Sequence, residues 1–419
     1  MTKENITKSC LPLFISLLML ASAMISCGNL DDFPELATVG NADDSAQEQE
    51  LKEQEVAVDL NDTIKINETA LTGEVEYVPS AVTGEEGYKD FVDNFLYDDD
   101  TQTWDDGVKS LEITFADDGV TYVYKNKNGK VKSLDTSTLS VTTDGAHVTV
   151  HAYKKMKFVL SGSTANGSFK IYSDKKFIVQ LNGVNITNPT GAAINCQKGD
   201  DGGKRCFLVV ADGTSNYLAD GTAYNTTEGE DEKGTFFSEG KVLVSGGGYL
   251  NIRSNAKHGL ACDDYIYLHA GPQLTITPAA GYDGLKTNDG VYIAGGVMNI
   301  TCSGVAAKGI NTAGMLMISG GRTTVVYKES DEVGESGSTD GDAVAGLSCC
   351  VKCDSVFSQS AGALLLSASS AGGNGINVAQ SLTMTGGTMV VVASGTPLTY
   401  GSLCREGGKI YVNNEEYSF

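Results

Sequence analysis

Acidic and amide side chains recur at equivalent positions near the middle of the chain. Asp263 and Asp264 form one pair, and Asn288 and Asp289 form the next. Calcium takes about six to eight oxygen ligands from carboxylates, carbonyls and water. On neighbouring strands about 4.8 Å apart, these side chains would form an oxygen cluster, with Asp283 at a nearby corner. We predict a calcium site at these five residues. The alternative is that acidic bends only solvate the surface and discourage edge pairing.

A second acidic stretch offers an alternative metal site. Residues 329–342 contain six acidic residues and neither Lys nor Arg. The candidate ligands there are Asp331, Glu332, Asp340 and Asp342.

Two tyrosines and a lysine are candidate ligand-binding residues beside the first cluster. Tyr267 and Tyr292 are separated by the same interval as Asp264 and Asp289, and Lys286 lies between them in the sequence. Aromatic faces offer flat apolar surfaces on which sugar rings can stack, so these residues predict a sugar-binding platform. The alternative is that the N-terminal segment or an edge loop packs over the tyrosines.

No motif in the sequence identifies an enzyme. His147 and His151 lie four residues apart in a strand-like stretch without the Glu of a zinc-protease helix. No G-x-S-x-G nucleophile elbow is present. A glycosidase pair cannot be selected among 53 acidic residues. A polysaccharide lyase remains an alternative, with calcium acidifying a uronate and Lys286 or Lys308 acting as the base.

The candidate metal and sugar ligands lie close together only if the chain folds into stacked structural repeats. One set of glycines recurs first at three equal intervals of about 25 residues and then at two longer ones: Gly234, Gly259, Gly284, Gly309, Gly346 and Gly375. A second set lies twelve residues after most of them: Gly246, Gly271, Gly296, Gly321 and Gly387. A period in the twenties is typical of a solenoid, and alternating apolar residues between the glycines indicate strands. We predict an all-β fold, a right-handed single-stranded parallel β-helix with three short strands per coil of about 25 residues.

The same register predicts which side chains point inward. The third position after each repeat glycine is expected to face the core: Phe237, Cys262, Thr287, Thr312, Cys349 and Val378. Cys302 is also expected in the core. Cys196 and Cys206 flank a polar loop, where a disulfide is one possibility, and a lone Cys350-x-x-Cys353 is weak evidence for a metal site.

Outward positions are expected to form ladders along the coils. The first strand of each coil contributes Ala261, Lys286 and Asn311, the second contributes Leu243, Tyr267, Tyr292 and Met317, and the third contributes Asn251, Thr275, Asn299 and Thr324.

Composition excludes some partners. The 419 residues include 50 Gly and are 41% apolar, which fits neither collagen nor a disordered chain. Acidic residues outnumber basic residues 53 to 30, for a net charge of −23. Because such a surface repels phosphate backbones, we expect no nucleic-acid partner. We expect the protein to be a monomer.

The N-terminus predicts export and lipidation. Lys3 and Lys8 precede an apolar run that is too short to span a membrane and ends at Cys27. The three residues ending at Cys27 resemble a bacterial lipobox, in which the cysteine is acylated. Asp31 and Asp32 resemble the signal that directs some lipoproteins to the outer surface. We predict an outer-membrane lipoprotein on the cell surface, bound to the membrane only through its lipid.

Domain boundaries follow from the repeat and from composition. We predict a signal peptide at 1–26, an acidic disordered tether at 27–60 and a partly ordered N-terminal cap at 61–112. The β-helix covers 113–400, and a C-terminal cap covers 401–419.

Several motifs in order resemble one known family. They are NGVNITN at 182–188, ADGTSNYL at 211–218, DGLK at 283–286 and DGD at 340–342. Over about 113–395 the chain resembles secreted bacterial parallel β-helix proteins that are classed as carbohydrate-binding. The resemblance implies a pectate-lyase-like shape, bound calcium, and non-catalytic binding of polysaccharide such as cellulose or a pectin-like polymer. An adhesin or structural surface protein without a sugar ligand is the alternative function.

Overall fold

The computed structural model describes residues 108–198, 205–333, 347–370 and 372–418. These residues form 30 β-strands and no helix, so the described part contains no helix that could cross a membrane. The strands make a β-solenoid of about ten turns with about 25 residues per turn, which confirms the predicted parallel β-helix. The predicted signal peptide with Cys27, the tether and most of the N-terminal cap lie outside the described residues.

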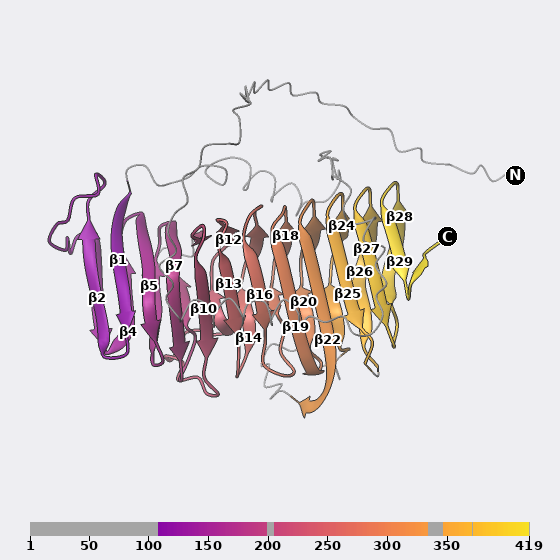
Figure 1. The fold of residues 1–419 in the computed structure, drawn as a ribbon, viewed down its shortest axis with the longest axis horizontal. Helices are drawn as coiled ribbons and strands as arrows, with labels where there is room; N and C mark the ends of the chain where they lie inside the picture. The colour runs from indigo at the N-terminus through magenta and orange to yellow at the C-terminus, as the bar shows by residue number, and fades with distance from the viewer. Residues whose placement is uncertain (1–107, 199–204, 334–346, 371, 419) are drawn as a thin grey trace, which may run out of the picture. The chain divides into compact units, whose positions relative to one another are not determined.

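Three stacks of parallel strands form the faces of the solenoid, and each strand pairs with the equivalent strand one coil away (Figure 1). Stack A consists of β4 (Ala146–Ala152), β6 (Gly167–Ser173), β8 (Ile194–Lys198), β11 (Gly234–Ser238), β14 (His258–Cys262), β17 (Leu285–Thr287), β20 (Lys308–Thr312), β23 (Cys349–Cys353) and the first parts of β26 (Asn374–Met384) and β28 (Leu398–Arg405).

Stack B follows stack A around the first corner of each coil. It consists of β1 (Lys109–Ala116), β5 (Met156–Thr164), β7 (Phe177–Asn188), β9 (Cys206–Val210), β12 (Val242–Ser245), β15 (Tyr265–Leu268), β18 (Gly290–Ile293), β21 (Met315–Ile318), β24 (Phe357–Gln359) and the second parts of β26 and β28.

Stack C closes each coil. It consists of the last parts of β5 and β7, then β10 (Ser215–Asp220), β13 (Tyr249–Arg253), β16 (Gln273–Thr277), β19 (Val297–Val305), β22 (Arg322–Val333), β25 (Ala363–Ala368), β27 (Thr388–Ala393) and β29 (Lys409–Val412). Antiparallel pairs occur only near the two ends of the described solenoid: β1 with β2 (Gly119–Lys125), β3 (Leu139–Asp144) with β4, and β29 with β30 (Glu415–Glu416).

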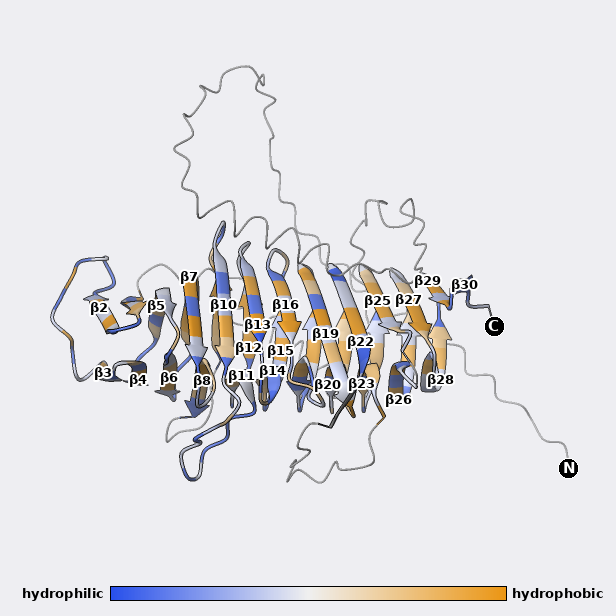
Figure 2. Cartoon of the chain, turned by 60° about the horizontal axis from the view of Figure 1, so that its bottom comes forward, coloured by the Kyte–Doolittle hydropathy of each residue, from blue (hydrophilic) through white to orange (hydrophobic). Residues whose placement is uncertain are grey.

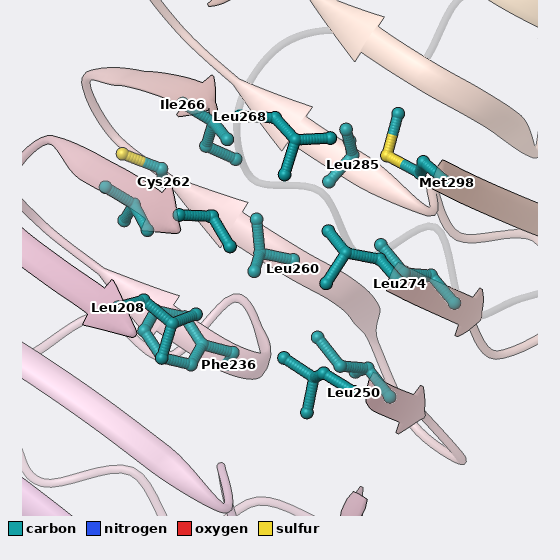
Figure 3. Packing of buried hydrophobic residues seen from close by; sticks show 14 of the residues in the cluster. Leu208, Phe236, Leu250, Leu260, Cys262, Ile266, Leu268, Leu274, Leu285 and Met298 are labelled. Carbon is teal, nitrogen blue, oxygen red and sulfur yellow. The ribbon is translucent and has the colours of Figure 1, made fainter. Parts of the chain in front are cut away.

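Alternation along each strand separates an apolar core from the outer faces. Blue and orange bands follow one another along strands such as β10 and β19 (Figure 2). Inward side chains from all three stacks meet inside the coil, for example Leu260 of stack A, Ile266 of stack B and Leu274 of stack C (Figure 3). Each of these side chains is at most 3% exposed. Burial of such side chains in every coil is the main stabilising contribution.

The second set of glycines lies at the bend between stacks B and C. Gly246, Gly271, Gly296, Gly321 and Gly387 all have positive φ angles, between 72° and 115°. Gly362 has the same conformation in the coil that the sequence pattern skipped. These bends bring successive coils so close that a Cβ atom on Gly321 would lie 2.6 Å from the carbonyl carbon of Gly295.

The register corrects one inward prediction by a single residue. Phe237 lies opposite Ala261, which faces outward, while Phe236 lies opposite Leu260 in the core. The prediction that Phe237 points inward is therefore wrong. The cause is a coil one residue shorter than the repeat, because Gly234 lies opposite His258 and not opposite Gly259.

An insertion explains why the last two glycine intervals are longer than the others. Lys308 lies opposite Cys349, and Cys349 lies opposite Asn374. Lys308 and Cys349 are sixteen positions further apart than one regular repeat, whereas Cys349 and Asn374 are separated by one regular repeat. The inward position predicted for Cys349 belongs instead to Cys353, which lies opposite Thr312.

Most of the other cysteines in the described residues are buried thiols, whereas Cys404 is exposed. Cys262 and Cys302 are core residues, as predicted. Cys196 and Cys206 are free thiols whose Sγ atoms lie 4.0 Å apart, so the structure contains no disulfide there. Burial raises the pKa of the Cys353 thiol to about 11, which disfavours the thiolate that a metal site requires.

The bend glycines generate a stability prediction with a matched control. Gly321→Ala should lower the free energy of unfolding by about 2–4 kcal/mol, because the methyl group meets the preceding coil and the backbone is left-handed. Gly183 has φ +73°, against +72° for Gly321, and a Cβ atom there would meet nothing within 4 Å. Gly183→Ala should therefore cost only about 1 kcal/mol. Equal losses in urea titrations of the two variants would contradict the close-approach argument.

Candidate functional site

The five residues predicted to bind calcium lie at opposite ends of stack A. Asp263 and Asp264 follow β14, and Asn288 and Asp289 follow β17, at the corner where stack A passes into stack B. Asp283 precedes β17, so the length of a strand separates it from this corner. The structure therefore brings four of the five residues to one corner and leaves Asp283 at the other.

Asp264 and Asp289 form the closest part of the predicted cluster. The backbone N–H of Asp289 donates to the carbonyl oxygen of Asp264 at 3.1 Å, so the two carboxylates come from equivalent positions of stacked coils. Burial raises the pKa of Asp264 to about 6, and the adjacent Asp289 carboxylate adds to this effect, while Lys241 opposes it. The corner therefore contains a pair of like charges in which Asp264 is half-buried and Asp289 is exposed.

The other two corner residues are directed elsewhere. Asp263 accepts a hydrogen bond from Lys233 Nζ at 2.6 Å, and the two form an ion pair. Asn288 is exposed. Among the residues that the structure describes, no group of three or more His, Cys, Asp or Glu side chains is placed to hold a metal ion. The protein alone thus supplies two neighbouring carboxylates at this corner.

Asp283 is surrounded by hydrogen-bond donors. Its Oδ1 accepts from the backbone N–H of Lys308 at 3.0 Å, and its Oδ2 accepts from Asn311 Nδ2 at 2.7 Å. Its own N–H donates to His258 Nδ1 at 2.8 Å. Burial lowers the pKa of His258 to about 4, with Asp283 opposing this effect and Lys286 adding to it. Neutral His258 and Asp283 thus join the starts of three successive strands.

A loop covers the outer face of stack A in its earlier coils. The loop connects β10 to β11, and its Glu230 pairs with Lys170 Nζ at 2.5 Å. Glu232 of the same loop accepts from Asn195 Nδ2 at 2.6 Å. Phe237 lies on this outer face and is fully buried. These contacts occupy the polar groups of the earlier coils.

The later coils of stack A carry a ladder of polar side chains on the same face. Lys286, Asn311, Lys352 and Asn377 occupy equivalent outward positions on four successive coils. Asn311 is 4% exposed, and its Oδ1 is buried without a hydrogen-bond partner. Lys352 Nζ forms an ion pair with Asp354 at 2.7 Å. We call these four residues the A-face ladder; it is a row of cationic and amide groups at a spacing of about 4.8 Å.

Sequence reasoning finds only half of this ladder. Lys286 is predicted as a ligand-binding residue and Asn311 as its outward neighbour, whereas Lys352 and Asn377 are missed. A signal for them exists, because Cys349 and Asn374 are separated by one regular repeat. The insertion shifts the repeat glycines away from that register, so the glycines alone do not reveal it.

The two predicted sugar-stacking tyrosines lie on the outer face of stack B. Tyr267 and Tyr292 are directly opposite each other on β15 and β18, as their spacing predicts. Tyr292 is only 4% exposed and packs edge-on against Tyr265, with ring centroids 5.7 Å apart. Tyr267 packs edge-on against His269 at 4.4 Å. The Tyr292 ring is therefore not an open platform.

The alternative metal site lies outside the described part of the chain. Strand β22 extends to Val333, but the side chains of Asp331 and Glu332 are not described. Asp340 and Asp342 belong to residues 334–346, which also lie outside it.

The like-charged corner generates a pH-dependent stability prediction. The pKa of Asp264 is about 6 in the folded protein and near its ordinary value in the unfolded chain. The stability contribution of this group therefore falls as the pH rises from about 4 to about 6. In the presence of a chelator, Asp264→Asn should raise the free energy of unfolding at pH 7 by about 1–2 kcal/mol, after solvent screening.

The same variant supplies its own control. At pH 3 the Asp264 carboxyl is protonated in both states, so wild type and Asp264→Asn should unfold at the same urea concentration. A gain that is as large at pH 3 as at pH 7 would show that the carboxylate pair is not its cause.

Comparison with known proteins places this geometry in context. No curated protein matches the chain. A solved structure titled as a polysaccharide lyase-like protein from C. thermocellum, in a gadolinium derivative, shares 20% identity, with a TM-score of 0.47. The match covers 71% of this chain and 99% of that one. The family model described as carbohydrate-binding domain-containing protein matches residues 135–415. The chain therefore belongs to the family of carbohydrate-binding domain-containing proteins.

Proposed function

We propose that this protein binds an acidic polysaccharide without cleaving it, along the A-face ladder. The observation that carries the proposal is the row of Lys286, Asn311, Lys352 and Asn377 on four successive coils, in a chain of a carbohydrate-binding family. A linear polymer presents equivalent groups at regular intervals, and a solenoid presents equivalent side chains in the same way.

The two lysines favour an acidic sugar over a neutral one. Lys286 and Lys352 are two strands apart, or about 10 Å, and hydrogen bonds from ammonium groups to carboxylates are stronger than those between neutral groups. Asn311 lies between them but is 4% exposed and donates to Asp283, so the accessible amide of the ladder is that of the half-buried Asn377. A pectin-like polymer fits this arrangement better than cellulose, which carries no charge.

Calcium at the Asp264–Asp289 corner would assist binding. The net charge of −23 repels an acidic polymer, and a divalent ion between protein and sugar carboxylates reverses the local charge. Two protein carboxylates leave most of the calcium ligands to be supplied by water and by the polysaccharide. The like-charge pair supports this assignment, because a cation there would relieve its repulsion. Asp263 and Asn288 adjoin the pair.

The two alternative functions require different groups on this surface. A calcium-dependent lyase would require Lys286 or Lys308 to act as a base on a uronate. A structural surface protein would require neither cation nor sugar. We propose in addition that Cys27 carries the lipid that holds the protein on the outer membrane, with the solenoid facing outward as a monomer.

The ladder predicts the effect of removing its charges. Lys286→Gln with Lys352→Gln should weaken binding to polygalacturonate by about tenfold, because two charge-assisted contacts are lost. The matched control is Lys130→Gln with Lys132→Gln, which removes the same charge from two exposed residues of another loop. Isothermal titration of both variants decides the assignment, and equal affinities would place the sugar elsewhere. Release of unsaturated sugar by the wild type would instead indicate a lyase.

The corner predicts a calcium effect on both stability and binding. Calcium at one hundred times its Kd should stabilise the wild type by about 2.7 kcal/mol and increase its retention on polygalacturonate. Asp264→Asn with Asp289→Asn should abolish both responses. Asp118→Asn with Asp144→Asn removes two exposed carboxylates as a control and should keep both. If the corner variant still responds fully, the candidate becomes the acidic stretch at 329–342.

Lipidation predicts the behaviour of a single variant. Cys27→Ser should abolish acyl labelling in cells and move the protein from the membrane fraction to the soluble fraction, because acyl chains provide the anchoring energy. Unchanged membrane association of this variant would contradict the proposed anchor.

A further inference from the structure

The corner between stacks A and B carries an excess of cations in the first coils of the solenoid. Each coil crosses this corner in a short connection from a stack A strand to the next stack B strand. The first four connections hold the described basic residues Lys154, Lys155, Lys175, Lys176, Arg205 and Lys241, and the described acidic residues Asp174 and Glu239. Residues 199–204 are not described; in the sequence they add two Asp and one Lys, so basic residues remain in excess. The charge of this corner is thus opposite in sign to the net charge of −23.

Four of these cations occupy the same position on successive coils. Lys155, Lys176, Arg205 and Lys241 each precede the first inward residue of a stack B strand, and these inward residues are paired from coil to coil. The carbonyl oxygens of Arg205 and Lys241 accept hydrogen bonds from backbone N–H groups of the preceding coil, at 3.1 and 2.8 Å. We call the four residues the corner ladder. The strand spacing gives it one cation about every 4.8 Å, over a length of about 14 Å.

The side chains of the corner ladder retain access to solvent. Lys155 is exposed, and the other three are half-buried. Partial burial is typical of long basic side chains, which lay their apolar stems along the protein and keep the charged end in water. Lys241 Nζ lies 4.8 Å from the ring centroid of Tyr265, which occupies the next position of the row. The row of cations therefore ends at an aromatic ring.

A row of like charges favours an anionic ligand. Cations on neighbouring coils repel one another at a spacing of about 4.8 Å. Asp174 and Glu239 are too few to neutralise the basic residues of the described connections, and Glu239 Oε2 accepts from the backbone N–H of Lys198 at 2.9 Å. A ligand that carries anions at regular intervals would remove this repulsion along the whole row.

We propose that the corner ladder is a second binding site for an acidic polysaccharide, which it contacts directly and without calcium. The proposal rests on the proposed function only for the class of ligand, because it uses other residues and no metal. A linear polyuronate carries one carboxylate per sugar, and the length of a sugar unit is close to the coil spacing. Each cation can thus meet one carboxylate in a charge-assisted hydrogen bond, and Arg205 can form two parallel bonds. All four residues lie within 135–415, the range matched by the carbohydrate-binding family model.

The neighbouring surfaces favour a polymer that follows this corner. On the earlier coils, the loop between β10 and β11 covers the outer face of stack A, where its Glu230 pairs with Lys170. Further along the same corner, the next two coils carry Asp264 and Asp289. A polymer on the corner would therefore contact the cations directly and then reach the proposed calcium site.

Fluorescence anisotropy with a labelled oligogalacturonate, in the presence of a chelator, tests the corner ladder. The background for every measurement is Lys286→Gln with Lys352→Gln, so that the cations of the A-face ladder do not contribute. In this background, Lys155→Gln with Lys176→Gln should weaken the remaining binding by about tenfold, because two charge-assisted contacts are lost.

Two controls accompany this variant. Lys155→Arg with Lys176→Arg keeps both charges and should retain the binding. Lys130→Gln with Lys132→Gln removes two charges from exposed residues away from the corner and should also retain it. Far-UV circular dichroism confirms that each variant is folded.

The outcomes separate the corner ladder from the A-face ladder. Loss of all binding in the background variant would assign the sugar to the A-face ladder alone and overturn the corner site. Undiminished binding in the background variant, abolished by the corner changes, would support the corner ladder and overturn the A-face ladder. Equal affinities of the corner variant and the Lys130→Gln with Lys132→Gln control would overturn the corner site, as would equal competition by a neutral cellulose oligomer.

Carbodiimide crosslinking of the wild type provides a second measurement if a variant does not fold. The reagent activates a sugar carboxylate, the Nζ of a contacting lysine forms an amide bond with it, and the reagent leaves as a urea. Mass spectrometry should find the attached sugar on Lys155 and Lys176 and not on the control lysines. Attachment to Lys286 and Lys352 alone would overturn the corner site and leave the proposed function intact.

Discussion

The close approach of successive coils at the bend between stacks B and C is the constraint on which the structure depends. Hydrogen bonds between parallel strands hold the coils at a spacing of about 4.8 Å. At that distance, a Cβ atom on Gly246 would lie 2.0 Å from the carbonyl oxygen of Val210, and other bends are similarly tight. Only glycine combines this contact with a positive φ angle at low cost. The inward apolar positions and the outward ladders keep their register because the bends are equivalent from coil to coil.

That constraint explains how much of the fold could be predicted from the sequence. The bend glycines are the most regular feature of the chain, so the parallel strands and the length of the repeat could be inferred from them. The errors occur where a coil changes length. A coil that is one residue short turns Phe237 outward, because a one-residue shift moves a strand side chain to the other face. Because sixteen additional residues precede Cys349, the spacing of the glycines no longer gives the true register of the strands there.

The candidate site was less predictable than the fold for a different reason. Stacking follows from the repeat, so the proximity of Asp264 and Asp289 could be inferred. The partners of the other acids come from positions that the repeat does not relate to them. Asp263 pairs with Lys233, which precedes a strand of the previous coil, and Asp283 is held by Asn311 on the next coil. Such pairings depend on side-chain length and direction, which a period of glycines does not encode.

The three outer faces of the solenoid differ in chemistry although one core supports them all. Stack A presents lysine and asparagine, stack B presents an apolar ladder, and stack C presents the predicted run of Asn251, Thr275, Asn299 and Thr324. This division is possible because inward and outward residues alternate, so an outward side chain can change without altering the core. An acidic chain can therefore concentrate cations along one face and bury apolar side chains on another.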